Sequence, residues 1–187
     1  MIRHLTARAA FQALYDEHRD AVWRYAARRV ADLDAADDVT TEVFVVAWRR
    51  REVVPADALP WLYGVARKVV ANHRRAADRR RSLQERLEQA AAPAVTVADD
   101  PVEAMGGREA VVAALERLTE SDRELLMLVA WEGLDADRLA AALGCRRGTA
   151  AVRLHRARKR LRAALDLDPD PSSTLHAPCM TPEKVTR

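Results

Sequence analysis

Several features that accompany other kinds of function are scarce or missing in this sequence. Only two of the 187 residues are cysteines, which is too few for a disulfide framework and typical of a reducing compartment. The chain has no Gly-rich phosphate loop and no His/Cys cluster with metal-ligand spacing, so we expect no catalytic site, no cofactor and no metal. No apolar run approaches the ~18–20 residues that span a bilayer, and the N-terminus has no signal-peptide core. We therefore expect a soluble cytoplasmic protein without membrane insertion.

Aromatic residues and β-strand patterns are also rare. Aromatic residues make up 5% of the chain and hydrophobic residues 49%, so aliphatic side chains must form most of the core. No segment alternates apolar and polar residues, whereas apolar residues recur at three- and four-residue steps, which indicates helices. Helices are predicted over residues 9–30 and 35–51. A third is predicted from about residue 57, with Pro60 in its first turn, to a basic run that ends at Arg81.

The composition changes after the basic run. Two prolines, a Gly pair and weak periodicity predict a linker between two helical domains. Beyond it, one helix is predicted over residues 109–118, and Ser121 with Glu124 has the spacing of a capping box that opens the next helix. The predicted order is a helical domain, a linker, a second helical domain and a disordered tail, over residues 1–81, 82–107, 108–167 and 168–187.

The most specific pattern lies in residues 134–165, which have the organisation of a helix-turn-helix. A short amphipathic helix turns Leu139 and Leu143 inward, and Gly144 supplies the tight turn. The next helix is predicted to bury four aliphatic side chains, Val152, Leu154, Leu161 and Leu165. It would present six cations to solvent, Arg153, Arg156, Arg158, Lys159, Arg160 and Arg162. Cations at this density repel one another unless an anion meets them, so we predict that this segment binds the phosphate backbone of DNA.

Three segments, in this order, resemble a known family. Residues 36–49 (A-D-D-V-T-T-E-V-F-V-V-A-W-R) and 60–75 (P-W-L-Y-G-V-A-R-K-V-V-A-N-H-R-R) resemble region 2 of sigma-70-type factors. Residues 118–134 (L-T-E-S-D-R-E-L-L-M-L-V-A-W-E-G-L) continue into the helix-turn-helix and resemble region 4. Without a separate region 3, the chain resembles the extracytoplasmic-function (ECF) group. The resemblance covers residues 9–165 and implies a bacterial transcription initiation factor that binds core RNA polymerase, recognises the −10 and −35 promoter elements and assists DNA melting.

The resemblance implies contacts with the beta-prime clamp and the beta flap of core polymerase, and an anti-sigma factor as regulator. The clamp-binding positions of the family correspond here to Asp38, Thr41, Glu42, Phe44 and Trp48. An aromatic anchor flanked by charges suits an interface hot spot, although Phe44 and Trp48 could also be core residues. Family members usually have Gln where Thr41 stands, so this contact is expected to be weaker.

In the family, the loop before the P-W-L-Y motif and the helix after it hold unstacked bases of the −10 element. The corresponding residues here are Trp61, Tyr63, Lys68, Asn72, Arg74, Arg75 and Arg79. Aromatic rings can stack on bases and cations can neutralise phosphates, but Trp61 could also be core and the basic run a solvated helix end. The usual A-R-N reads Ala66-Arg67-Lys68 here, which puts the usual −10 preference in doubt, although Asn72 remains available.

The −35 element would be read by the second helix of the helix-turn-helix in the major groove. The residues implied are Arg146, Arg147, Thr149, Arg153, His155, Arg156 and Lys159. The family's common G-T-V-K-S-R reads G-T-A-A-V-R over residues 148–153, so a cation is missing at Ala151 and a hydroxyl at Val152. Because a bidentate base contact provides ~1–3 kcal/mol of discrimination, we expect a less selective helix unless Arg147 compensates.

Two other classes compete with this interpretation. A stand-alone helix-turn-helix regulator would normally carry an α/β ligand-binding or phosphoacceptor domain, and the N-terminal half shows no strands. An enzyme acting on nucleic acid would need clustered acids or metal ligands, whereas the acids here are scattered. Binding to core polymerase distinguishes the sigma interpretation from both.

Overall fold

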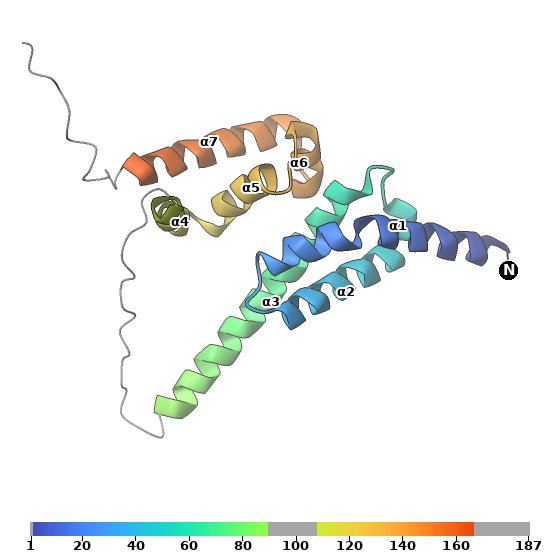
Figure 1. Cartoon of the computed structure of the whole chain (residues 1–187), viewed down its shortest axis with the longest axis horizontal. Helices are drawn as coiled ribbons and strands as arrows, with labels where there is room; N and C mark the ends of the chain where they lie inside the picture. Colours follow the sequence, from blue (N-terminus) through green and yellow to red (C-terminus); the bar gives the residue numbers. More distant parts are fainter. Residues whose placement is uncertain (1, 90–107, 167–187) are drawn as a thin grey trace, which may run out of the picture.

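The computed structural model describes residues 2–89 and 108–166, and within these ranges the chain forms seven α-helices, one short 3-10 turn and no strand (Figure 1). The all-α fold predicted from the sequence is confirmed. The predicted tail and most of the predicted linker lie outside the described residues. Among the described helices none is long and apolar enough to cross a membrane. Within the same ranges, no three His, Cys, Asp or Glu residues are grouped to hold a metal ion.

The first three helices form a bundle, here called the N-terminal block. Its elements are α1 (Ile2–Ala27), α2 (Leu33–Arg49), the 3-10 turn η1 (Arg51–Val53) and α3 (Ala58–Gln89). Each helix packs on the other two. The side chains that they bury completely include Val22, Tyr25, Val39, Val43 and Leu62. Helix α2 begins at an N-cap, because the Asp32 carboxylate accepts a hydrogen bond from the Ala35 N–H at 2.7 Å.

Helix α3 is longer than the sequence analysis predicts. The expected end near Arg81 is wrong, and the helix continues to Gln89. A cluster of positive charge does not by itself end a helix, and no Gly or Pro occurs between Gly64 and Pro93. The Arg, Gln, Glu, Ala and Leu residues of this stretch all favour helix. The C-terminal part of α3 therefore extends beyond α1 and α2 as a regular helix (Figure 1).

The second bundle, here called the C-terminal block, is built around its last helix. Its elements are α4 (Arg108–Glu116), α5 (Glu120–Ala130), α6 (Ala136–Leu143) and α7 (Arg147–Asp166). Helix α7 packs on the other three and buries Ala150, Ala157 and Ala164 at seven-residue steps. The predicted burial of Val152 is wrong, since that side chain is 50% exposed. Val152 follows Ala150 by two residues, about 200° around the helix, so it faces away from the core. The other three predicted aliphatic residues are half-buried, namely Leu154, Leu161 and Leu165.

The capping box of α5 lies two residues earlier than predicted. Thr119 Oγ1 accepts a hydrogen bond from the Asp122 N–H at 3.2 Å and donates one to Asp122 Oδ2 at 2.9 Å. Asp122 occupies the third helical position that the sequence analysis gave to Glu124. Both spacings satisfy the pattern, and the tertiary structure selects the earlier one because Glu124 points toward the N-terminal block.

The two blocks pack against each other through α3 and α6. Buried residues of both blocks belong to one continuous core that includes Leu62 of α3 and Leu139 of α6. Gly64 marks the closest approach, because a Cβ atom there would lie 2.8 Å from the carbonyl oxygen of Ala142. The absence of a side chain at Gly64 therefore allows α6 to lie directly on α3.

Candidate functional site

Helix α2 presents one exposed face that contains four of the five residues predicted to bind polymerase. Asp38, Thr41, Glu42 and Trp48 are exposed. They share one side of the helix, because Thr41 and Glu42 follow Asp38 by three and four residues and Trp48 follows Thr41 by seven, which is two turns. The Trp48 side chain is 39% exposed, and the Arg51 guanidinium lies 5.1 Å from the centre of its ring. An aromatic ring partly open to solvent, next to acidic and basic groups, is the composition of a protein-binding surface.

The fifth residue, Phe44, lies beneath this face and not on it. Its side chain is 3% exposed and meets the rings of Tyr15 and Phe11 edge-on, with centroids 4.7 Å and 6.4 Å apart. Phe11 also meets Trp48 edge-on at 5.1 Å. The ring of Phe44 therefore belongs to the core and supports the exposed face indirectly through Phe11. The sequence could not decide this, because Phe44 lies on the boundary between the apolar and polar sides of the helix.

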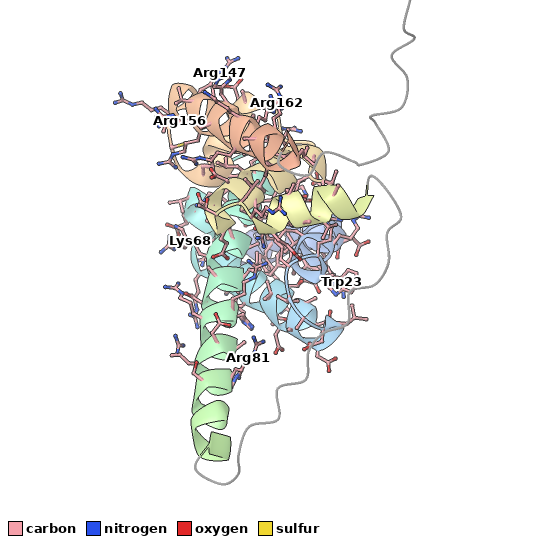
Figure 2. The ribbon with its side chains drawn as sticks, turned by 90° about the vertical axis from the view of Figure 1, so that its left-hand side faces the viewer. Trp23, Lys68, Arg81, Arg147, Arg156 and Arg162 are labelled. Atoms are coloured by element: carbon pink, nitrogen blue, oxygen red, sulfur yellow. The ribbon has the colours of Figure 1, made fainter. Side chains whose placement is uncertain are left out.

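Four of the seven residues predicted to contact the −10 element form one exposed stripe on α3. Lys68, Asn72, Arg75 and Arg79 follow at steps of four, three and four residues. Arg75 Nη2 donates a hydrogen bond to Asn72 Oδ1 at 2.6 Å, which orients the Asn72 amide. The basic side chains along α3 and α7 extend into solvent (Figure 2).

The other three residues of that set are partly or wholly covered. Trp61 and Arg74 are half-buried, and Tyr63 is only 3% exposed. The Tyr63 ring lies 5.2 Å from that of Tyr25, and burial together with the nearby negative charge of Glu132 raises the pKa of Tyr63 to about 12. In this arrangement the Tyr63 ring is not accessible to a DNA base.

The helix-turn-helix has the geometry that the sequence indicates. Gly144 has a φ of +63°, and the N–H groups of Gly144 and Cys145 donate to the carbonyl oxygens of Ala141 and Ala140. This is a Schellman ending, and only Gly adopts its left-handed position without strain. The turn directs α7 away from α6. Seven side chains predicted to contact the −35 element are all exposed, namely Arg146, Arg147, Thr149, Arg153, His155, Arg156 and Lys159.

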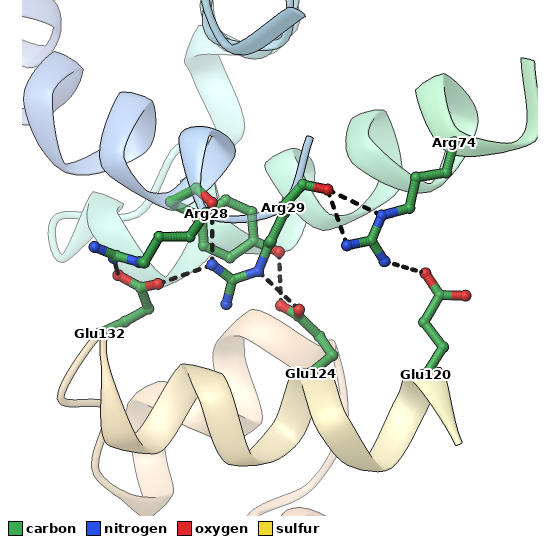
Figure 3. Close-up of polar contacts among 7 residues, drawn as sticks. Arg28, Arg29, Arg74, Glu120, Glu124 and Glu132 are labelled. Atoms are coloured by element: carbon green, nitrogen blue, oxygen red, sulfur yellow. Dashed lines mark hydrogen bonds and ion pairs between the residues drawn. The ribbon is translucent and has the colours of Figure 1, made fainter. Parts of the chain in front are cut away.

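Sequence reasoning missed a polar cluster between the two blocks (Figure 3). At its centre is Arg29, whose side chain is 1% exposed. Arg29 Nε donates to Glu124 Oε2 at 2.8 Å, and Nη1 donates to Glu132 Oε1 at 3.0 Å. Arg28 Nη2 donates to Glu132 Oε2 at 2.6 Å, and the Tyr25 hydroxyl donates to Glu124 Oε1 at 2.6 Å. These pairs join residues about a hundred positions apart, so no local pattern identifies them.

The cluster changes the acid–base properties of its members. Burial raises the pKa of Tyr25, and the adjacent Glu124 carboxylate raises it further. For Arg29, burial acts to lower the pKa, but the combined effect of Tyr25, Glu124 and Glu132 raises it. The arginine is therefore charged and the tyrosines neutral at any physiological pH. Arg29 Nη2 has no hydrogen-bond partner although it is buried.

A groove of about 550 Å³ runs along the same boundary. Its basic wall comes from α3 and its acidic wall from the first turns of α5. The polar side chains along it are Arg67, Lys68, Asn72, Arg74, Arg75, Glu120, Ser121 and Glu124. Four of the seven residues predicted to contact the −10 element thus line a groove whose other wall is the N-terminal part of α5.

Comparison with known proteins relates both blocks to one family. Residues 14–80 match the family described as Sigma-70 region 2, and residues 108–161 match Sigma-70, region 4. The chain is similar to the ECF RNA polymerase sigma factor SigL of Mycobacterium tuberculosis, with 35% identity over 160 residues that cover 84% of this chain and 89% of SigL. It is also similar to SigK of Mycobacterium ulcerans, with 30% identity over 169 residues that cover 85% of this chain and 87% of SigK.

Two solved structures share the arrangement of helices. One is CnrH in complex with the cytosolic domain of CnrY, with a TM-score of 0.56 and 27% identity over 87% of this chain and 91% of that chain. The other is the sigma factor RpoE in complex with the anti-sigma factor NepR from Bartonella quintana, with a TM-score of 0.52 and 24% identity over 86% of this chain and 99% of that chain. The second likeness concerns the fold alone.

Proposed function

Because this chain belongs to the ECF group of sigma-70 factors, we propose that it binds core RNA polymerase and directs it to promoters by recognising a −10 and a −35 element. The family identifies a promoter-directing transcription initiation factor. We assign each promoter element to a surface of this chain as part of the proposal. The proposed function also includes assistance in melting the promoter DNA.

One observation carries the assignment of the −35 element to α7. This helix buries a row of alanines and exposes on its remaining surface six of the seven side chains predicted to contact the −35 element, and the seventh, Arg146, is exposed just before it. Small buried residues bring α7 close to the rest of its block, which leaves its long basic side chains free to reach a major groove. Arg147 is only loosely restrained, since its Nε lies 3.5 Å from Asp137 Oδ1 and both side chains are about 70% exposed. Such an exposed pair is weak, so Arg147 is available to DNA.

The exposed face of α2 is proposed to bind the beta-prime clamp of core polymerase. Trp48 is its anchor, because a half-exposed Trp loses the most apolar surface when a partner covers it. The stripe on α3 is proposed to hold the −10 strand, with Lys68 and Arg79 on phosphates and Asn72 on a base edge. The C-terminal block is proposed to contact the beta flap.

We also propose that an anti-sigma factor regulates this chain. The support is the likeness to CnrH, which is seen in complex with the cytosolic domain of CnrY. No residue of this chain is assigned to that contact.

Run-off transcription tests the proposed function. Purified core polymerase is supplied with this protein and fragmented DNA of the source organism, and we expect discrete start sites that appear only with the protein. Arg153→Ala with Arg156→Ala should abolish these starts without loss of core binding. The matched control removes the same charge from the same helix at Arg158 and Arg162.

A second pair of variants tests the polymerase-binding face. Trp48→Ala should weaken core binding, whereas Leu33→Ala removes another exposed apolar side chain of α2 and should not. Absence of core binding by the unmodified protein would refute the sigma assignment. A stand-alone DNA-binding regulator would then be the better interpretation.

A further inference from the structure

The outward face of α7 carries an apolar side chain among its cations. Val152 is 50% exposed, and among the residues that the structure describes it is the one large apolar side chain of α7 that is exposed. It follows the buried Ala150 by about 200° around the helix, so it points almost directly away from the core. Arg156 and Lys159 follow Val152 by four and seven residues, and both are exposed on the same face. Val152 therefore lies on the surface that is proposed above to enter the major groove.

The first two turns of α7 carry only short side chains on this outward face. They are Gly148, Thr149, Ala151 and Val152, and all are exposed. At Gly148 the space in which a side chain would begin is open, with no neighbouring atom within 4 Å. Short side chains allow the start of the helix to approach base edges closely, which is where the second helix of a helix-turn-helix reads sequence. The long cations farther along the helix suit phosphates.

The apolar character of Val152 selects among the groups that DNA presents. In the major groove, thymine offers a methyl group, whereas the edges of adenine, guanine and cytosine offer hydrogen-bond donors and acceptors. A valine that covers the methyl group removes apolar surface from water on both molecules. Against an amino or carbonyl group, the same valine would leave that group without a hydrogen-bond partner. An uncharged side chain also has no attraction for a phosphate, so thymine is the favoured contact.

We propose, on the premise that α7 binds the −35 element, that Val152 recognises the 5-methyl group of a thymine there and so determines sequence specificity. The side chains at positions 151 and 152 are both apolar and cannot form hydrogen bonds to a base. Apolar contact at Val152 supplies selectivity that hydrogen bonds from these two positions cannot supply.

Deoxyuridine in place of thymine tests the contact, because the change removes only the 5-methyl group and keeps the base pair. A random duplex library is first selected on the full-length protein, with and without core polymerase, to obtain the sequence that it enriches. Each thymine of that sequence is then replaced singly by deoxyuridine, and competition binding measures the affinity. The proposed −10 surface takes unstacked bases, so an intact duplex bound by the protein alone reports on α7.

Two valine variants are compared with the unmodified protein. Val152→Ala removes the proposed contact, and Val112→Ala makes the same change on α4, where the side chain is 49% exposed. Alanine favours helix more than valine does, so neither variant should lose stability, and thermal unfolding checks this. For the unmodified protein and Val112→Ala, deoxyuridine at one thymine position should weaken binding about fourfold, as the loss of one buried methyl group predicts. Val152→Ala should bind the two duplexes equally.

Three results would overturn the role of Val152. The first is that no sequence is enriched, and the second is that no thymine position responds to deoxyuridine. The third is a response that persists in Val152→Ala, which would assign the effect to another side chain or to the flexibility of the DNA.

Failure of this role and failure of the proposed function are distinguishable. Discrete start sites in run-off transcription without a thymine response would support the sigma function and refute the contact. A response that is lost in Val152→Ala, in a protein that gives no start sites, would support base recognition by α7 and refute the sigma function.

Discussion

Arg28 and Arg29 are adjacent and chemically identical, yet the structure predicts that their replacement by Ala has different effects. The Arg29 side chain is 1% exposed and pairs with two carboxylates that are 14% and 3% exposed, those of Glu124 and Glu132. Arg28 is 33% exposed and pairs with Glu132 alone. Removing one member of a buried ion pair costs about 3–5 kcal/mol, because the remaining charge is left without its partner in a poorly hydrated site. Arg28 is partly open to water, and Glu132 keeps Arg29 as a partner when Arg28 is removed, so this pair is expected to contribute about 1 kcal/mol or less.

The structure sets an upper limit on the unfolding free energy that Arg29→Ala can remove. Glu124 keeps the Tyr25 hydroxyl at 2.6 Å and Glu132 keeps Arg28 at 2.6 Å, so neither carboxylate loses every partner. The blocks can also separate and hydrate both groups, so the cost cannot exceed the free energy that closes the interface. We therefore expect a decrease in unfolding free energy near 3 kcal/mol for Arg29→Ala and ~1 kcal/mol or less for Arg28→Ala.

Urea unfolding followed by tryptophan fluorescence measures both values. Trp131 is a suitable reporter, because the Arg28 guanidinium lies 5.6 Å from its ring centre at the edge of the interface. Scattering before unfolding distinguishes a folded, open protein from a partly unfolded one. Equal losses for the two variants, or a loss below ~1 kcal/mol for Arg29→Ala, would refute the reasoning, because a buried network would then be absent in solution.

The remaining predictions concern single side chains. Trp48→Ala should weaken binding to core polymerase by ~2 kcal/mol or more while thermal unfolding changes little, and a pull-down with core enzyme checks this. If Arg153 contacts a base, Arg153→Ala should weaken binding to the −35 element by ~1–3 kcal/mol. If it contacts a phosphate, the slope of the logarithm of the binding constant against the logarithm of the salt concentration should fall by about one, and titrations at several salt concentrations distinguish the two cases. Thr119→Ala should lower stability by ~1 kcal/mol, whereas Ser121→Ala should change it little; thermal melts that show equal effects would contradict the assigned cap. The pKa of Tyr63 is raised from 10.0 to about 12 in the closed state, so closure is favoured below pH 10 and this contribution is lost as pH rises toward 12; scattering across that range should show the blocks separating.

Tertiary contacts decided two of the points at which the sequence analysis was wrong about local structure, the burial of Val152 and the cap of α5. The apolar period of α7 allowed Val152 to be buried, but the row Ala150, Ala157 and Ala164 packs more closely. Two capping boxes satisfied the same spacing at the start of α5, and the position of Glu124 in the interface left Thr119 as the cap. In each case the sequence offered two physically acceptable solutions, and contacts with other helices selected one.

The amino-acid sequence alone determined the helical fold, the turn at Gly144, the basic character of α7 and the family, because each depends on residues close together in the chain. Periodicity, a left-handed glycine and charge density are local properties, so they can be read without coordinates. Only the tertiary structure placed Phe44 and Tyr63 in the interior and joined Arg29 to Glu124 and Glu132. Those contacts join residues about a hundred positions apart, and their energy depends on burial that exists only once the two blocks have packed together.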